Sequence, residues 1–174
     1  MKTLFLPLFT LLFVWTLSAQ TYNTYPTQNG IASPLPKTSI QPGTNPGTLN
    51  VYEHQNGIRE ISPSKVIKVQ PSGQKEFYDT QNGIPEISPS KVVKPNSQGG
   101  YEVYGTNNGL PDISPSKSVK PNQQGGYDIY EHSNGLPNIS PSQSLKPNRQ
   151  GGYDVYEHSN GIPGISPVKV IKKD

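Results

Sequence analysis

The chain has no cysteine, so disulfides cannot hold it together and no lipid can be attached through a terminal thiol. Large apolar side chains are also scarce. Hydrophobic residues make up 30% of the 174 positions, and Phe77 is the only Trp or Phe beyond the first nineteen residues. Proline and glycine, with 19 and 17 copies, take about a fifth of the sequence. This composition excludes a large, dry hydrophobic core of the usual globular kind.

A concentrated block of positive charge is missing as well. The chain carries 15 basic and 12 acidic residues, a net charge of +3, and these side chains are scattered along its length. Nucleic-acid-binding proteins gather Lys and Arg into one patch or stripe. We therefore expect no nucleic acid among the partners.

The one long apolar run lies at the N-terminus. Lys2 precedes an almost continuously apolar segment from Leu4 to Trp15, and Leu17-Ser18-Ala19 ends in small residues. This pattern predicts a signal peptide over residues 1–19, because the run is short for a membrane span. An uncleaved anchor is the alternative. We expect export, with the mature chain secreted or at the cell surface and without a membrane span after cleavage.

A 26-residue unit, repeated without a slip in length, fills residues 51–174. Its tyrosine recurs at Tyr52, Tyr78, Tyr104, Tyr130 and Tyr156, and an Asn-Gly pair follows each of them at a constant distance. Residues 20–50 form a Thr/Pro/Asn-rich region with a degenerate copy that contains Tyr25 and Asn29-Gly30-Ile31. Such repetition predicts a repeating surface rather than one asymmetric pocket. We interpret the degenerate copy as a cap or a decayed unit.

Each unit contains two short strand candidates. The first, as in Gly126 to Glu131, alternates aromatic or β-branched residues with charged ones. The second, as in Lys65 to Lys68, keeps one aliphatic position that we expect to face inward. These inward positions are Ile67, Val93, Val119, Leu145 and Ile171. The residue before each of them varies, so we expect it to be half covered.

Two kinds of connection join the strands. The segment from Pro95 to Gly100 and its equivalents predict a hairpin turn, in which Lys120 would face Asp128 or Glu131. The segment from Asn108 to Ser116 opens with a turn and is then held extended by prolines. We expect its aliphatic residues to cover the adjacent hairpin. No part of the mature sequence has helical periodicity.

A single unit has too few apolar side chains to fold alone. It has about six apolar side chains, each contributing ~1.5–3 kcal/mol when buried, whereas ordering its residues costs on the order of 1.5 kcal/mol each. We therefore predict an all-β repeat fold, with short strands and hairpins in an elongated array and substantial Pro/Gly-rich irregular structure. A partly disordered, flexible chain is the open alternative.

Catalytic and metal chemistry are not indicated. The carboxylate position of the unit changes from copy to copy, through Glu60, Glu86, Asp112, Asn138 and Gly164. We therefore predict no catalytic residue, no cofactor and no enzymatic activity. His54, His132 and His158 share one unit position, and stacking would bring the last two together. A solvated strand end explains them as well as an incidental metal site does, so we predict no metal.

The tyrosines are the candidate binding residues. Stacked units would align Tyr52, Tyr78, Tyr104, Tyr130 and Tyr156 in one ladder and Tyr101, Tyr127 and Tyr153 in a second on the opposite strand face. Exposed aromatic rows suit an extended polysaccharide, and buried ones fill the space between units. Both interpretations stay open.

The sequence favours an exported, non-enzymatic repeat protein with a structural or multivalent interaction role at the cell surface or in an extracellular matrix. Its partners would be an extended polysaccharide, a surface protein or further copies of the chain. Polysaccharide binding through stacked tyrosines is the alternative function. A precursor of many similar peptides is disfavoured, because the only Lys-Lys pair is Lys172-Lys173.

Overall fold

The computed structural model describes residues 20–174, so the predicted signal peptide lies outside the described residues. Strands, turns and short connections make up this part of the chain, and none of it is helical. The expected all-β class is confirmed. Residues 20–174 contain no helix that could cross a membrane.

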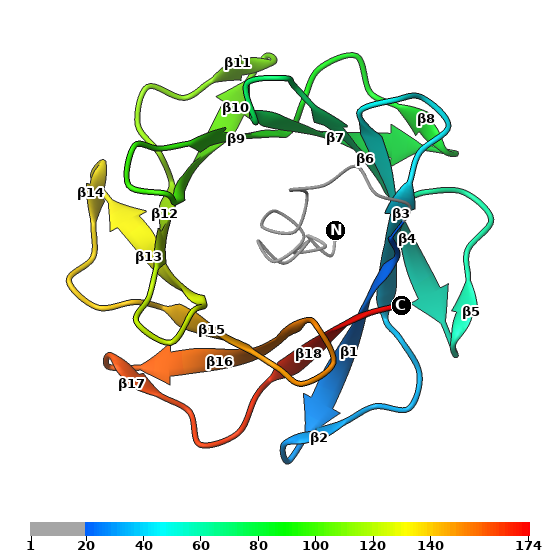
Figure 1. Ribbon diagram of the computed structural model, residues 1–174. Coiled ribbons are helices and arrows are strands. Elements are labelled where there is room, and N and C mark those ends of the chain that lie inside the picture. The colour runs from blue at the N-terminus through cyan, green and yellow to red at the C-terminus, as the bar shows by residue number, and fades with distance from the viewer. Residues whose placement is uncertain (1–19) are drawn as a thin grey trace.

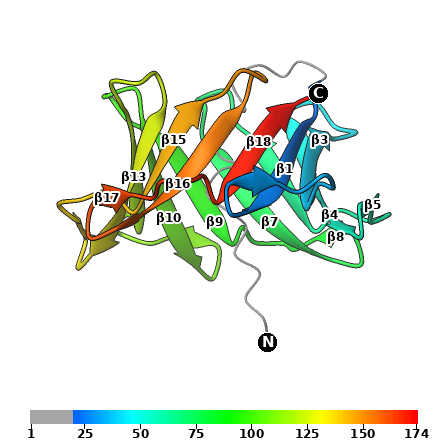
Figure 2. The ribbon, with the colours of Figure 1, turned by 90° about the horizontal axis from the view of Figure 1, so that it is seen from below.

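Twelve antiparallel strands form a closed barrel, seen along its axis in Figure 1 and from the side in Figure 2. Neighbours along the chain pair around the barrel, and the last strand pairs with the first, with Tyr22 opposite Lys173. The barrel strands are β1 (Tyr22–Gln28), β3 (Thr38–Pro42), β4 (Thr48–Gln55), β6 (Lys65–Val69), β7 (Lys75–Gln81), β9 (Lys91–Pro95), β10 (Tyr101–Asn107), β12 (Lys117–Pro121), β13 (Tyr127–Ser133), β15 (Gln143–Pro147), β16 (Tyr153–Ser159) and β18 (Lys169–Lys173).

Six short strands lie outside the barrel wall. The last two residues of each first strand leave the barrel and pair with a two-residue strand that follows an Asn-Gly turn, as Asn107 pairs with Leu110. Six outer loops thereby leave the barrel at the end where the first strands finish, here called the loop end, and project outward around the ring (Figure 1). The short strands are β2 (Ile31–Ala32), β5 (Ile58–Arg59), β8 (Ile84–Pro85), β11 (Leu110–Pro111), β14 (Leu136–Pro137) and β17 (Ile162–Pro163).

The expectation of an elongated array is wrong, because the units close into a ring. The degenerate copy does not cap a stack: its strands β1 and β3 pair on both sides and form the sixth unit. Its extra residue lies in the hairpin between Pro42 and Leu49 and leaves the register of the strands intact. Strand twist and curvature bring the two ends together, and closure removes the unpaired edges that an open array would expose.

The two connections form as the turn residues require. Asn108 and Gly109 both have positive φ, 49° and 81°, which is the primed turn geometry favoured in tight hairpins. In the Gly-Gly hairpins, at the opposite or hairpin end of the barrel, the second glycine leaves no room for a side chain. A Cβ on Gly126 would lie 1.8 Å from the Leu145 carbonyl oxygen. The hairpin prediction is confirmed, with Lys120 opposite Asp128.

Alternate residues of the twelve strands face the barrel interior and build one core. The predicted inward aliphatics, such as Val119 and Leu145, are fully buried there and meet the equivalent residues of the first strands, such as Ile129 and Val155. Tyr22, Tyr127 and Tyr153 pack against this core toward the hairpin end. Every unit therefore supplies a few side chains to a core that none could build alone.

Two expectations about burial are wrong. The residues beside the inward aliphatics are buried rather than half covered, because the next unit covers them on the outer face of the barrel. This set comprises Ser39, Val66, Val92, Ser118, Ser144 and Val170. Conversely, Leu110 and Ile113 do not cover a hairpin, since they are 73% and 102% exposed.

The contrast between core and loop positions predicts the stability of two variants. Leu145→Ala should lower the free energy of unfolding by about 2–5 kcal/mol, because Leu145 is fully buried in the barrel. Ile139→Ala, at a fully exposed loop position, should change it by less than about 0.5 kcal/mol. Denaturant unfolding of both variants checks the pair. Equal losses would contradict the assignment of the barrel interior as the core.

Candidate functional site

The first tyrosine ladder lies on the outer face of the barrel, where each ring is covered by a basic side chain. Lys94 Nζ is 4.7 Å from the centroid of the Tyr104 ring, and Lys146 Nζ lies 4.7 Å from that of Tyr156. The same contact recurs at Tyr25, Tyr78 and Tyr130, at 4.2–5.0 Å. Such cation–π contacts occupy a ring face that a sugar would need.

The unit around Tyr52 keeps this contact by a different route. Gln41 stands where the other units have lysine, and Arg59 of the outer loop takes over, with its guanidinium 4.5 Å from the Tyr52 ring centroid. Arg59 also donates to the Gln41 side-chain oxygen at 2.6 Å. Arg59 occupies the position that is the leading proline in the other full copies, and its contact with Tyr52 accounts for this difference.

Two tyrosine hydroxyls of the outer ladder are bound by carboxylates. Tyr104 Oη donates to Glu102 at 2.6 Å, and this hydrogen bond, with burial, raises the pKa of Tyr104 to about 12. Burial and the 2.8 Å bond to Glu76 raise the pKa of Tyr78 to about 12. These hydroxyls have partners on their own strands, and the covering lysines, such as Lys94 over Tyr104, come from the preceding unit. The outer ladder is therefore engaged in contacts within and between units.

The second ladder lies inside the barrel at the hairpin end. Tyr101 is 3% exposed, and the rings of Tyr127 and Tyr153 have centroids 6.3 Å apart. The structure adds Tyr22 to this layer and places Lys75 in it where the later units have tyrosine. Lys75 Nζ lies 4.2 Å from the Tyr101 ring centroid, and burial lowers the pKa of Lys75 to about 8.

The three histidines bind serines of the preceding unit rather than gathering in one place. Nε2 of His132 lies 2.8 Å from Ser118 Oγ, and Nε2 of His158 lies 2.8 Å from Ser144 Oγ. His54 contacts its serine in the same way at 3.0 Å. Among residues 20–174 no group of three acidic, histidine or cysteine side chains could hold a metal ion.

A matched exchange accompanies these histidines at all six unit boundaries. Where the preceding strand has serine, the next unit has histidine; where it has valine, the next unit has threonine. Thr80 Oγ1 and Thr106 Oγ1 donate instead to the carbonyls of Pro63 and Pro89, at 2.5 Å each. The Ser–His boundaries are Ser39–His54, Ser118–His132 and Ser144–His158, and the Val–Thr boundaries are Val66–Thr80, Val92–Thr106 and Val170–Thr27.

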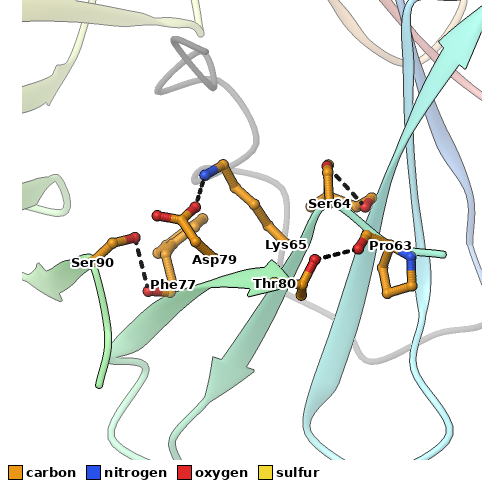
Figure 3. A network of polar contacts seen from close by, with 8 residues as sticks. Pro63, Ser64, Lys65, Phe77, Asp79, Thr80 and Ser90 are labelled. Atoms are coloured by element: carbon orange, nitrogen blue, oxygen red, sulfur yellow. Dashed lines mark hydrogen bonds and ion pairs between the residues drawn. The ribbon is translucent and has the colours of Figure 1, made fainter. Parts of the chain in front are cut away.

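Charged residues line the interior at the loop end. Lys65 donates to Asp79 across one strand pair (Figure 3), and Lys117 donates to Glu131 across another. Lys91 faces Gly105 in the register, and its pKa is lowered by burial and by its lysine neighbours. Lys65 and Lys117 thus form ion pairs within the barrel.

The outer loops carry the accessible apolar surface of residues 20–174. Two aliphatic side chains point into solvent from each loop of the five full units and one from the loop of Ile31, and we call this set the loop aliphatics. The first positions, 71–75% exposed, are Ile31, Ile58, Ile84, Leu110, Leu136 and Ile162; the second, 97–102% exposed, are Ile61, Ile87, Ile113, Ile139 and Ile165.

Neighbouring loops pack closely enough to form grooves. The Asn-Gly turn of one loop rests on the serine after the second aliphatic of the preceding loop, since a Cβ on Gly161 would lie 2.7 Å from Ser140 Oγ. An open groove of about 670 Å³ lies between these two loops, with Leu136 and Ile139 on one side and His158 on the other. Small residues at this contact hold the loops in place and leave the aliphatics uncovered.

No known protein family and no curated protein matches the chain. Five chains of solved structures match it, among them BamB from Moraxella catarrhalis, at 12% sequence identity and a TM-score of 0.32. That match covers 74% of this chain and 57% of BamB. The chain therefore spans little more than half the length of that protein.

The site that the geometry leaves for a partner is thus the ring of outer loops. It offers apolar contact at six similar places. The sequence already contained an indication of this site, because Ile recurs at one position in all five full copies and lies between two prolines in four of them. The sequence could not show that this residue is exposed, because the repeat alone does not tell which side chains are buried.

A double substitution tests the matched exchange at the unit boundaries. Ser118→Val should lower the free energy of unfolding by about 1–3 kcal/mol, because it removes the Nε2 partner of half-buried His132, whose buried Nδ1 already has none. Adding His132→Thr recreates a Val–Thr boundary and should recover most of the loss, a coupling of about 0.5–3 kcal/mol. A thermodynamic cycle from denaturant unfolding checks this. Additive effects of the two substitutions would contradict it.

Burial of Lys75 predicts a pH-dependent cost to folding. Because its pKa falls from 10.5 to about 8 in the barrel, the penalty is full below pH 8 and disappears as pH rises toward 10.5. Lys75→Met should therefore raise the free energy of unfolding by about 1–3 kcal/mol at pH 7. The gain should shrink between pH 8 and 10.5. A gain that does not change with pH would contradict the prediction that burial penalises the charged form of the Lys75 amine.

Proposed function

We propose that this protein is an exported, non-enzymatic interaction module that binds its partner through the loop aliphatics. The function is multivalent: six loops present nearly the same apolar contact around one ring. Export rests on the predicted signal peptide, and it places the module at the cell surface or in an extracellular matrix.

One observation supports this proposal above the others. The five isoleucines from Ile61 to Ile165 are fully exposed, and nothing in residues 20–174 packs on them. The neighbouring carboxylate position drifts from glutamate to glycine, whereas the isoleucine is kept in every full copy. A side chain that contributes nothing to the fold yet recurs unchanged is explained by contact with something outside the chain.

Polysaccharide binding through tyrosines remains a prediction without a supporting contact. The outer rings are covered on one face by basic side chains, and Tyr101 is buried in the barrel. A sugar would have to displace these contacts before it could stack. The loop aliphatics need no such rearrangement.

Graded substitution of the loop aliphatics tests the proposal in cells that export the full-length chain. Replacing one, two, three and five of the exposed isoleucines by serine should reduce retention of the protein on washed cells. Because linked weak contacts multiply, the loss should be steeper than proportional to the number replaced. Retention is measured by immunoblotting of cell and medium fractions.

The matched control is the same series with valine, which keeps an apolar contact and should keep most of the retention. Thermal unfolding should be unchanged in both series, since these side chains are exposed. Retention that survives all five serine substitutions would overturn the proposal. Retention lost through one particular isoleucine alone would show a single site instead of a multivalent surface.

A further inference from the structure

We infer that the loop end of the barrel docks against the loop end of a second copy, forming a dimer of two rings face to face. The inference rests on the proposed function and names the partner of the loop aliphatics. The partner that covers the loop aliphatics is a second copy of this chain rather than a lipid surface or an unrelated protein.

The first argument is area. At about 25 cal/mol per Å², the ~1.5–3 kcal/mol of one buried aliphatic side chain corresponds to ~60–120 Å². Scaled by their exposures, the loop aliphatics present roughly 600–1,100 Å². The largest apolar patch of a typical monomer is about 300–600 Å², and a stable interface takes about 800 Å² from each partner. The loop end has the apolar area of one half of a dimer.

The second argument is symmetry. All six loops follow the same end of a first strand, and they surround the barrel axis as outward-projecting loops (Figure 1). A two-fold interface requires a surface that is complementary to itself. Nearly identical loops around a ring meet this requirement, because a two-fold axis between two copies sets loop against loop.

The third argument is charge. The residue before the second aliphatic is acidic in three adjacent loops, Glu60, Glu86 and Asp112. It is uncharged in the other three, Ser33, Asn138 and Gly164. At this position the ring therefore has an acidic half and an uncharged half. The one basic neighbour, Arg59 beside Glu60, is held over Tyr52 and bonded to Gln41. One orientation of the two-fold axis places each acidic loop against an uncharged one, and like charges avoid each other.

This orientation makes the arrangement specific. It sets the loop of Glu86 opposite that of Gly164, the loop of Asp112 opposite that of Asn138, and the loop of Glu60 opposite that of Ser33. The same carboxylates would be repelled by an anionic lipid surface. Charge thus selects the second copy over an anionic bilayer as the occupant.

Sedimentation velocity of the secreted full-length product tests the dimer. We expect a dimer at about micromolar concentration, since interfaces of this size bind at micromolar or tighter. Ile87→Ser, Ile113→Ser and Ile139→Ser together should give a monomer. Its thermal unfolding should match that of the wild type when both are measured well below micromolar concentration, where neither protein is dimeric. The matched valine variant should remain a dimer. A wild-type monomer well above micromolar concentration, or a dimer that survives the serine substitutions, would overturn the inference.

Charge substitutions test the orientation without removing apolar surface. Ser33→Asp, Asn138→Asp and Gly164→Asp together make all six loops acidic and should weaken the dimer about tenfold or more. Added salt should restore much of the affinity, because it screens exposed charges. An unchanged dissociation constant would overturn the charge-matched arrangement.

Disulfide trapping locates the contact directly, because the natural chain has no cysteine. A mixture of the Glu86→Cys and Gly164→Cys proteins should form a mixed disulfide dimer under mild oxidation. Each protein alone should form little, and so should Gln124→Cys, which lies at the hairpin end. Equal trapping in all samples, or trapping through Gln124→Cys, would overturn the face-to-face dimer.

Phosphatidylcholine vesicles provide the remaining comparison. Co-sedimentation of a monomeric wild-type protein with them would overturn the inference in favour of a lipid surface.

The inference and the proposed function can fail separately. If the wild type is monomeric but the serine variants still lose cell retention, only the second copy is refuted as partner. If retention also survives, both fail.

Discussion

The structure depends on burial that is shared between units. Each first strand pairs with the second strand of the preceding unit on one side and with that of its own unit on the other, as β10 does with β9 and β12. Val103 lies opposite Val93 in one pairing and opposite Lys117 in the other, and it is buried in the same core as Val93 and Val119. No unit has enough apolar side chains to stabilise itself. The closed ring gives every unit two neighbours, and hence no unit is left with an uncovered face.

This constraint explains which parts of the unit vary. Positions that face a neighbour change together, as serine with histidine and valine with threonine, because the histidine Nε2 meets the serine hydroxyl whereas the threonine hydroxyl bonds a backbone carbonyl. Arg59 replaces a lysine that its unit lacks and restores the cover over Tyr52. Tyrosines that could have bound a ligand instead make contacts at these unit boundaries and inside the barrel. The loop aliphatics are the exception, since they recur but touch no neighbour.

Much of the local structure could be predicted from the sequence. The strands, the Asn-Gly turns, the Gly-Gly hairpins and the inward position of residues such as Val119 and Leu145 follow from alternation and turn chemistry within one unit. The candidate site could not be predicted in the same way. The sequence singled out the tyrosines because aromatic rows suit ligands, whereas the structure covers Tyr104 with Lys94 and buries Tyr101. It also exposes Ile113, which an argument from hydrophobicity placed against a hairpin.

The sequence by itself determined the unit, its two strands and its dependence on neighbours, because these follow from spacing, turn residues and the shortage of apolar side chains. The tertiary structure decided that the units form a ring and that the degenerate copy completes it. The physical reason is that closure depends on strand twist and curvature accumulated over twelve strands, and no single unit specifies that sum. Once the ring closes, each side chain is either inside it, between units or at the loop end. That division, and not residue type alone, leaves the isoleucines available to a partner.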